Sequence, residues 1–150
     1  MHTFLVNIRY FLTPTLIVLS LLGVILGGNW VWLGVVLFAS SIVADYLTSA
    51  VKSIHCEAAG RDQDGETIGI PWLLKTMMWA QYPVFVSLQL ALIWRVYEYT
   101  SGVPIGSMEL LGLNIQTGIT GWQLAGATIS ASLYLGLGIM FGHELAHTKG

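Results

Sequence analysis

The sequence predicts an all-α integral membrane protein with four transmembrane helices. Of its 150 residues, 55% are hydrophobic and only 9% are charged, against roughly a quarter charged in ordinary globular chains. The charged residues collect in short clusters that separate long uncharged runs, a layout typical of polytopic helical membrane proteins. The net charge of −2 offers no basic face for nucleic acid. We therefore expect the lipid bilayer, and no nucleic acid, as a partner.

Four apolar runs define the expected helices of one transmembrane domain, residues 1–150. They lie at about residues 10–26, 30–51, 73–97 and 122–147. Each run is close to the ~20 residues that cross ~30 Å of hydrocarbon. Gly27 and Gly28 break the first run from the second. The section 100–120 is rich in Gly, Ser and Thr, which is typical of a loop.

The distribution of basic residues predicts the orientation of these helices. Five of the six belong to the N-terminus, the second loop and the C-terminus, and one lies on the opposite side: Arg9, Lys52, Arg61, Lys75 and Lys149 against Arg95. Cytoplasmic loops of membrane proteins carry an excess of Lys and Arg. Both ends of the chain are therefore expected in the cytoplasm.

A histidine motif at the end of the fourth run carries the clearest chemical signal. His143 and His147 are four residues apart, so in a helix they lie on one face, one turn apart. Imidazole is a suitable ligand for iron and for zinc. Glu144 makes the segment a His-Glu-x-x-His sequence, which is also the zinc-protease signature. The motif predicts a metal site without choosing between the two metals.

The motif and its context resemble a known family. His143-Glu144-Leu145-Ala146-His147, followed by Lys149, is similar to the first histidine box of the membrane-bound non-heme di-iron alkane and xylene monooxygenases. These enzymes are relatives of the integral membrane fatty acid desaturases. The upstream match comprises Arg9-Tyr10-Phe11-Leu12 with Pro14, Gly27-Gly28, Trp30-Val31-Trp32-Leu33-Gly34, Asp45 and Gln81-Tyr82.

The resemblance implies hydroxylation of an alkane terminus or an aryl methyl group with O2 at two non-heme iron ions. It makes His143 and His147 the first two iron ligands. It also implies the bacterial cytoplasmic membrane as location, and rubredoxin or a flavin/iron–sulfur reductase as electron donor. Members of the family continue into a six-helix bundle with further histidine boxes. We therefore expect the missing C-terminal part of the same protein to complete the site, and this segment alone to be inactive.

Two acidic residues are expected to support the metal ligands. Asp45 lies within the second apolar run, where an acid is a functional-site hypothesis by default. We expect it to hydrogen-bond the free N–H of a ligand imidazole. A salt bridge to Lys75, or a side chain that extends to the membrane interface, is the alternative. Glu144, between the two histidines, is assigned the same supporting role.

Four residues are expected to line a substrate channel. Gly136 and Ile139 precede His143 by seven and four residues on one helix face, and glycine leaves room for a narrow apolar slot. Phe38 and Ile42 share the face of Asp45 and are expected to form the opposite wall. Plain helix packing is the alternative for all four.

Three other functions fit the same motif. A fatty-acyl desaturase or hydroxylase of the same superfamily also has two histidines separated by three residues in its first box. A zinc intramembrane protease is indicated by the His-Glu-x-x-His sequence alone. A non-enzymatic four-helix scaffold would need neither metal. Metal analysis separates the protease from the monooxygenase and the desaturase, because the latter two need two irons and the protease needs one zinc.

Overall fold

The computed structural model describes the backbone of residues 2–48 and 71–147, with side chains for residues 11–44, 46, 72, 76–77 and 79–136. Within these ranges the chain forms four α-helices, a 3-10 turn and a β-hairpin. The helical elements are α1 (His2–Leu26), η1 (Gly28–Trp32), α2 (Leu33–Thr48), α4 (Pro71–Thr100) and α5 (Gly121–His147). The strands are β1 (Gly106–Leu110) and β2 (Leu113–Thr117).

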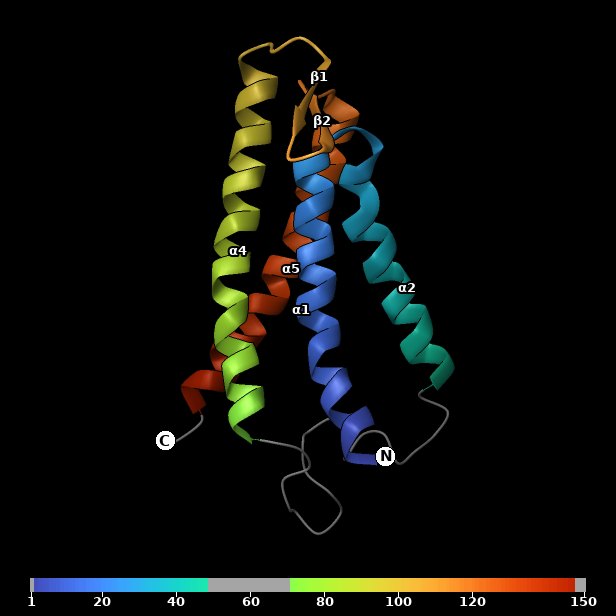
Figure 1. The fold of residues 1–150 in the computed structure, drawn as a ribbon, viewed down its shortest axis with the longest axis vertical. Helices are drawn as coiled ribbons and strands as arrows, with labels where there is room; N and C mark the ends of the chain where they lie inside the picture. Colours follow the sequence, from blue (N-terminus) through green and yellow to red (C-terminus); the bar gives the residue numbers. More distant parts are fainter. Residues whose placement is uncertain (1, 49–70, 148–150) are drawn as a thin grey trace.

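The helices run along the long axis of the molecule in alternating directions (Figure 1). Helix α1 packs against α2, α4 and α5, and α5 also packs against α2 and α4. The β-hairpin lies at one end of this bundle, which we call the hairpin end. Both chain termini lie at the opposite end, which we call the terminal end (Figure 1). An even number of antiparallel helices brings the two termini to the same end.

The core lies along the helix contacts of α1, α4 and α5. It is formed by buried apolar side chains of α1, η1, α4 and α5: Ile17, Val24, Val31, Phe85, Leu88, Ala91, Ala127, Ala131 and Tyr134. Fully burying a large aliphatic side chain stabilises the fold by roughly 1.5–3 kcal/mol. The small residues on α5 let its backbone approach α1 and α2 closely.

Gly34 marks the closest approach of three helices. A Cβ atom there would collide with the Ser20 hydroxyl of α1 and would lie 2.7 Å from the Cβ of Ser130 in α5. Contacts this short do not occur between real side chains, so glycine is required where α2 crosses this pair. Substitution here forces the three helices apart.

The prediction of an all-α fold is wrong at residues 106–117. The section expected to be a loop contains β1 and β2, which pair antiparallel with Met108 opposite Ile115 and Leu110 opposite Leu113. Apolar residues at these positions alternate with polar ones, which is the two-residue period of a strand. The turn between the strands is formed by Leu111 and Gly112, both with positive φ.

The prediction of four transmembrane helices is also wrong. Among the residues that the structure describes, no helix combines the length and the apolarity needed to cross a membrane. The expected second span is the clearest case. Its apolar run is divided between η1 and α2, and α2 has only 16 residues. At 1.5 Å per residue this helix is about 24 Å long, short of the ~30 Å of bilayer hydrocarbon.

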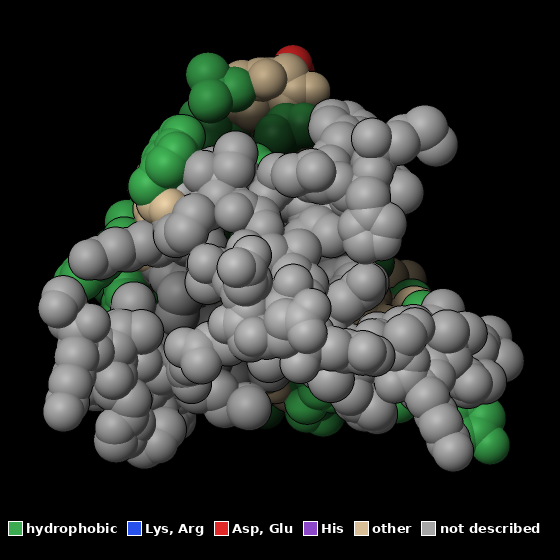
Figure 2. All heavy atoms as spheres, turned by 90° about the horizontal axis from the view of Figure 1, so that it is seen from below, with side chains coloured by type: hydrophobic (Ala, Val, Ile, Leu, Met, Phe, Trp, Pro, Cys, Tyr) green, Lys and Arg blue, Asp and Glu red, His purple; other side chains and the backbone are tan. Residues whose placement is uncertain are grey.

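The outer faces of the described helices are apolar. Exposed large side chains occur on each helix, including Phe11, Val36, Val43, Leu90, Ile93 and Ile129. Viewed from the terminal end, the described side chains around the rim are mostly hydrophobic (Figure 2). Among side chains that the structure describes, Glu109 is the one charged group on the surface, because Arg95 and Glu98 are buried.

Candidate functional site

The histidine motif lies in the last two turns of α5. The helix continues without interruption from Gly121 to His147, so positions 143 and 147 are one helical turn apart, about 6 Å along the axis. Position 144 lies in the same turn. The side chains of these three residues fall outside the described set. The backbone thus has the helical spacing on which a two-histidine site depends.

The structure does not bring the ends of α2 and α5 together. Asp45 lies in the last turn of α2, which ends at Thr48. Both helices end on the terminal side of the bundle, but they diverge to opposite edges of it, with α1 and α4 between them (Figure 1). The side chain of Asp45 is outside the described set, and its support of a ligand imidazole stays a prediction.

The four expected channel residues have different surroundings. Phe38 is half-buried and packs edge-on against Tyr134 of α5, with ring centroids 6.1 Å apart. Ile42 is exposed on α2. Gly136 is exposed as well, and a Cβ atom there would meet nothing within 4 Å. Ile139 lies in α5 outside the described side chains. Phe38 therefore does contact α5, but the contact is with Tyr134.

The contact between Phe38 and Tyr134 belongs to a buried polar seam. The Tyr134 hydroxyl donates to the Gly34 carbonyl at 3.3 Å, and the Ser130 hydroxyl donates to the Val31 carbonyl at 2.6 Å. Burial raises the pKa of Tyr134, so the phenol remains a neutral donor. These bonds join α5 to the start of α2.

Two buried acceptors have no hydrogen-bond partner among the described residues. They are Oε1 of Gln81 on α4 and the Ser20 hydroxyl oxygen on α1. Leaving a buried polar atom unpaired costs about 1–3 kcal/mol. Both groups are neutral, so they offer hydrogen bonding and no charge to the bundle interior.

Among the described side chains, the buried charged groups are Arg95 and Glu98 near the hairpin end. The side chain of Arg95 is fully buried. Its Nε donates to the Val24 carbonyl at 2.9 Å and its Nη2 donates to the Ile25 carbonyl at 2.6 Å. These carbonyls belong to the last turn of α1, whose acceptors have no partner within the helix. The guanidinium also carries positive charge, which is favourable at a helix C-terminus.

The same guanidinium is tied to the hairpin. Its Nη1 donates to Glu98 at 2.5 Å and to the Gln116 carbonyl at 2.8 Å. Glu98 is also buried, and its other oxygen accepts the backbone N–H of Gly118 at 3.3 Å. We call Arg95 and Glu98 with these main-chain partners the arginine clamp. It fastens α1, α4 and β2 to one another.

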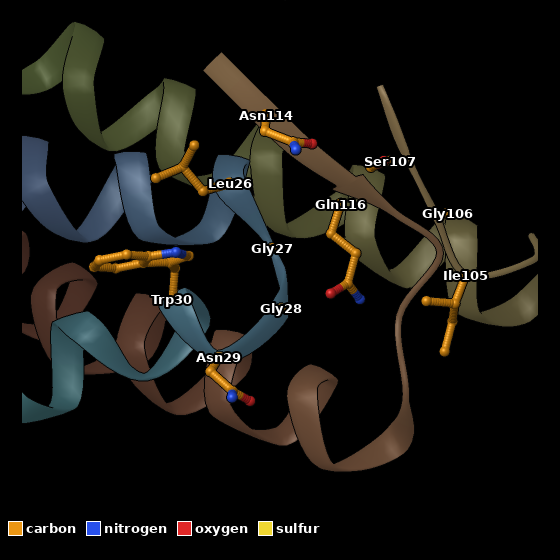
Figure 3. Close-up of a pocket in the computed structure, with 10 residues that line it drawn as sticks. All are labelled: Leu26, Gly27, Gly28, Asn29, Trp30, Ile105, Gly106, Ser107, Asn114 and Gln116. Carbon is orange, nitrogen blue, oxygen red and sulfur yellow. The ribbon is translucent and has the colours of Figure 1, made fainter. Parts of the chain in front are cut away.

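A shallow cavity of about 380 Å³ lies beside the arginine clamp, between the α1–η1 turn and the hairpin. Gly27 and Gly28 form that turn with φ of 73° and 59°. A Cβ on Gly27 would lie 2.5 Å from the Arg95 guanidinium. Figure 3 shows the Gln116 side chain extending between the hairpin and this turn. Its amide donates to the Gly118 carbonyl and to the side chain of Gln123, so it closes the cavity floor.

The arginine clamp was not found from the sequence. The spacing of Arg95 and Glu98 fits a surface ion pair across one helical turn. The signal that could have distinguished a buried arginine from a surface ion pair was Gly27, because its lack of a side chain leaves room for the guanidinium. The main-chain carbonyls that bind it carry no side-chain signature. Tyr134 was likewise read only as part of an apolar run, and Gln81 only as part of the family resemblance.

No family model, curated protein or solved structure matches this chain. Among the described side chains, no three His, Cys, Asp or Glu residues are grouped so that they could hold a metal ion. The two motif histidines lie outside the searched set.

Proposed function

We propose that this chain supplies the first two histidine ligands of a non-heme di-iron hydroxylase that acts on an alkane terminus or an aryl methyl group. The observation that carries the proposal is the continuity of α5 through His143 and His147. A break of the helix within the motif would have separated the two positions. A helix keeps residues at i and i+4 on one face, which suits two imidazoles that share one metal site.

Iron fits this donor set, because imidazole nitrogen is among its preferred ligands. Two iron ions, when bound, would supply the activation of O2. The part of α5 that precedes the motif has no charged residue between Gly121 and Gly142. Such a helix can hold a hydrocarbon near the metal without competing charges. Electrons are proposed to come from a rubredoxin or a flavin/iron–sulfur reductase.

Metal and product analysis test this function. The protein should be expressed from its complete open reading frame, purified, and assayed for iron and zinc. About two irons per chain, with alcohol formed from an alkane or an aryl methyl substrate, is the expected result. One zinc without iron would favour a hydrolase of the His-Glu-x-x-His type. Two irons with products only from acyl substrates would favour a desaturase or fatty-acyl hydroxylase.

A substitution at Gly136 tests whether the substrate path follows α5. Because a side chain at this position meets no neighbouring atom within 4 Å, Gly136→Leu should fold normally and bind iron. We expect it to shorten the longest alkane that is accepted. Turnover across a ladder of chain lengths measures the effect, with Ile129→Val on the same helix as a control. An unchanged length profile with iron still bound would place the path elsewhere.

A further inference from the structure

The tip of the hairpin has an unusual residue for its backbone conformation. Leu111 and Gly112 have φ of 53° and 77°, as both central residues do in a type I′ turn. The first position of that turn favours Asn, Asp or Gly, and a bulky residue at positive φ is strained. Strained backbone positions of this kind cluster at functional sites.

The side chain of Leu111 packs against nothing in the described molecule. It is 95% exposed, more than any other large hydrophobic residue described. Leu110, Leu113 and Met108 are half-exposed beside it. We call these four side chains the leucine tip. Leu111 therefore adds nothing to the core, and the strain at its backbone is not offset by packing within the fold.

Polar side chains of the hairpin border the cavity between the hairpin and the bundle. Ser107, Asn114 and Gln116 alternate with the apolar positions of β1 and β2, and all three line the cavity beside the α1–η1 turn (Figure 3). Only the base of the apolar face is covered, where Ile115 is buried. A strand pair that packs on a protein normally places its apolar face inward. Here the outer part of that face points away from the bundle.

Exposed aromatic rings surround the same end of the molecule. They come from η1, the end of α4 and the start of α5: Trp30, Tyr97, Tyr99 and Trp122. Trp and Tyr are enriched where an apolar region meets a polar one, above all at membrane–water interfaces. Glu109 is the only charged side chain exposed on this described end. A surface of this composition has no charge to offer to an anionic partner.

We propose that the leucine tip docks on a lipid surface, with Leu111 inserted among the lipid chains near the headgroups. The apolar side chains of the tip, beside the one carboxylate of Glu109, and the aromatic rings around it match the chemistry of a zwitterionic phospholipid interface. Four side chains with this exposure present on the order of 400 Å² of apolar surface, about half of the ~800 Å² that each partner of a stable protein complex buries. The area is thus too small for pairing with a second copy.

The depth of insertion is limited by the hairpin backbone. The described sheet has two strands, so each strand has one edge whose N–H and C=O groups are not paired within the sheet. Such groups cannot be satisfied in hydrocarbon, but water and headgroups satisfy them at the interface. The proposal is independent of the proposed function, because the leucine tip and the histidine motif lie at opposite ends of the bundle (Figure 1).

A fluorophore next to the tip tests the docking. In the full chain with Cys56→Ser, an Asn114→Cys variant would carry an environment-sensitive nitrobenzoxadiazole label. The protein is mixed with phosphatidylcholine vesicles that contain lipid with a nitroxide on the upper acyl chain. We expect a blue shift and strong quenching. Adding Leu111→Asn should lower the inserted fraction about tenfold, because it removes the most exposed apolar side chain of the tip.

Two controls separate docking from folding. Asn adopts positive φ readily, so Leu111→Asn should not lower the thermal midpoint without lipid. Gly112→Asn alters the same turn without removing an apolar side chain and should leave quenching unchanged. Equal quenching in the Leu111→Asn variant, or none in the parent, would overturn the proposal. So would quenching that needs anionic lipid and disappears at high salt, or a Leu111-dependent self-association in sedimentation velocity.

Discussion

Replacing Arg95 with methionine is expected to lower the free energy of unfolding by about 3–5 kcal/mol, the usual cost of removing one partner from a buried ion pair. The guanidinium is fully buried and binds Glu98 and three backbone carbonyls. Methionine fills much of the same volume but donates no hydrogen bond. Glu98 is then left buried without its cation, and the last turn of α1 loses its cap.

Denaturant unfolding of Arg95→Met measures this loss. The double variant Arg95→Met/Glu98→Leu should recover part of it, because it removes the uncompensated carboxylate while the α1 carbonyls stay uncapped. Glu98→Gln is the milder matched change, since the amide oxygen can still accept from Gly118. Amide hydrogen exchange at Gly118 reports on the same bond. A loss below about 1 kcal/mol in Arg95→Met would show that the arginine clamp is not a stabilising unit.

Replacing His143 or His147 with alanine is expected to remove iron and hydroxylation together. Each substitution takes one imidazole from a pair that the proposed site shares, and the double variant should therefore be no worse than either single one. Iron analysis and turnover on the same preparation make the measurement. His55→Ala, which changes a histidine without ligand spacing to a second donor, serves as the matched control. Full iron content and turnover in His147→Ala would refute the assignment.

Each apolar run overlaps a helix of the structure, but not all of the ends agree: α1 begins at His2 and not near residue 10, and the second run is divided between η1 and α2. The final helix, expected at 122–147, is α5 at Gly121–His147. The same runs could not show which apolar side chains are buried between helices and which are exposed, since buried Val31 and exposed Val36 count alike in a composition. The expectation of four membrane spans failed for that reason.

The hairpin was missed because its turn lacks the usual signal. Two strands joined by Asn-Gly or Asp-Gly are recognised easily, but here Leu111 stands at the first turn position. The alternation from Ser107 to Leu110 and from Leu113 to Gln116 was present in the sequence. It was hidden by the many Gly, Ser and Thr residues around it, which read as a loop.

The histidine motif was visible in the sequence because it is local, with both histidines inside one turn and a half of helix, and metal binding there stays a prediction. The arginine clamp is the opposite case. Its partners are main-chain atoms of Val24 and Ile25, which are 71 and 70 positions from Arg95. Only the tertiary structure brings them together, and the residue types at positions 24 and 25 do not indicate the contact.

That separation along the chain sets an order of assembly during synthesis. Helix α1 is complete when Leu26 has been made. The donor to the carbonyls of its last turn, Arg95, is translated about seventy residues later. The hairpin contact comes later still, since Gln116 follows Arg95 by 21 residues. Helices α1 and α2 are therefore made while the last carbonyls of α1 still lack this donor, and α4 supplies it. Domains made of such distant contacts fold more slowly than those made of local ones.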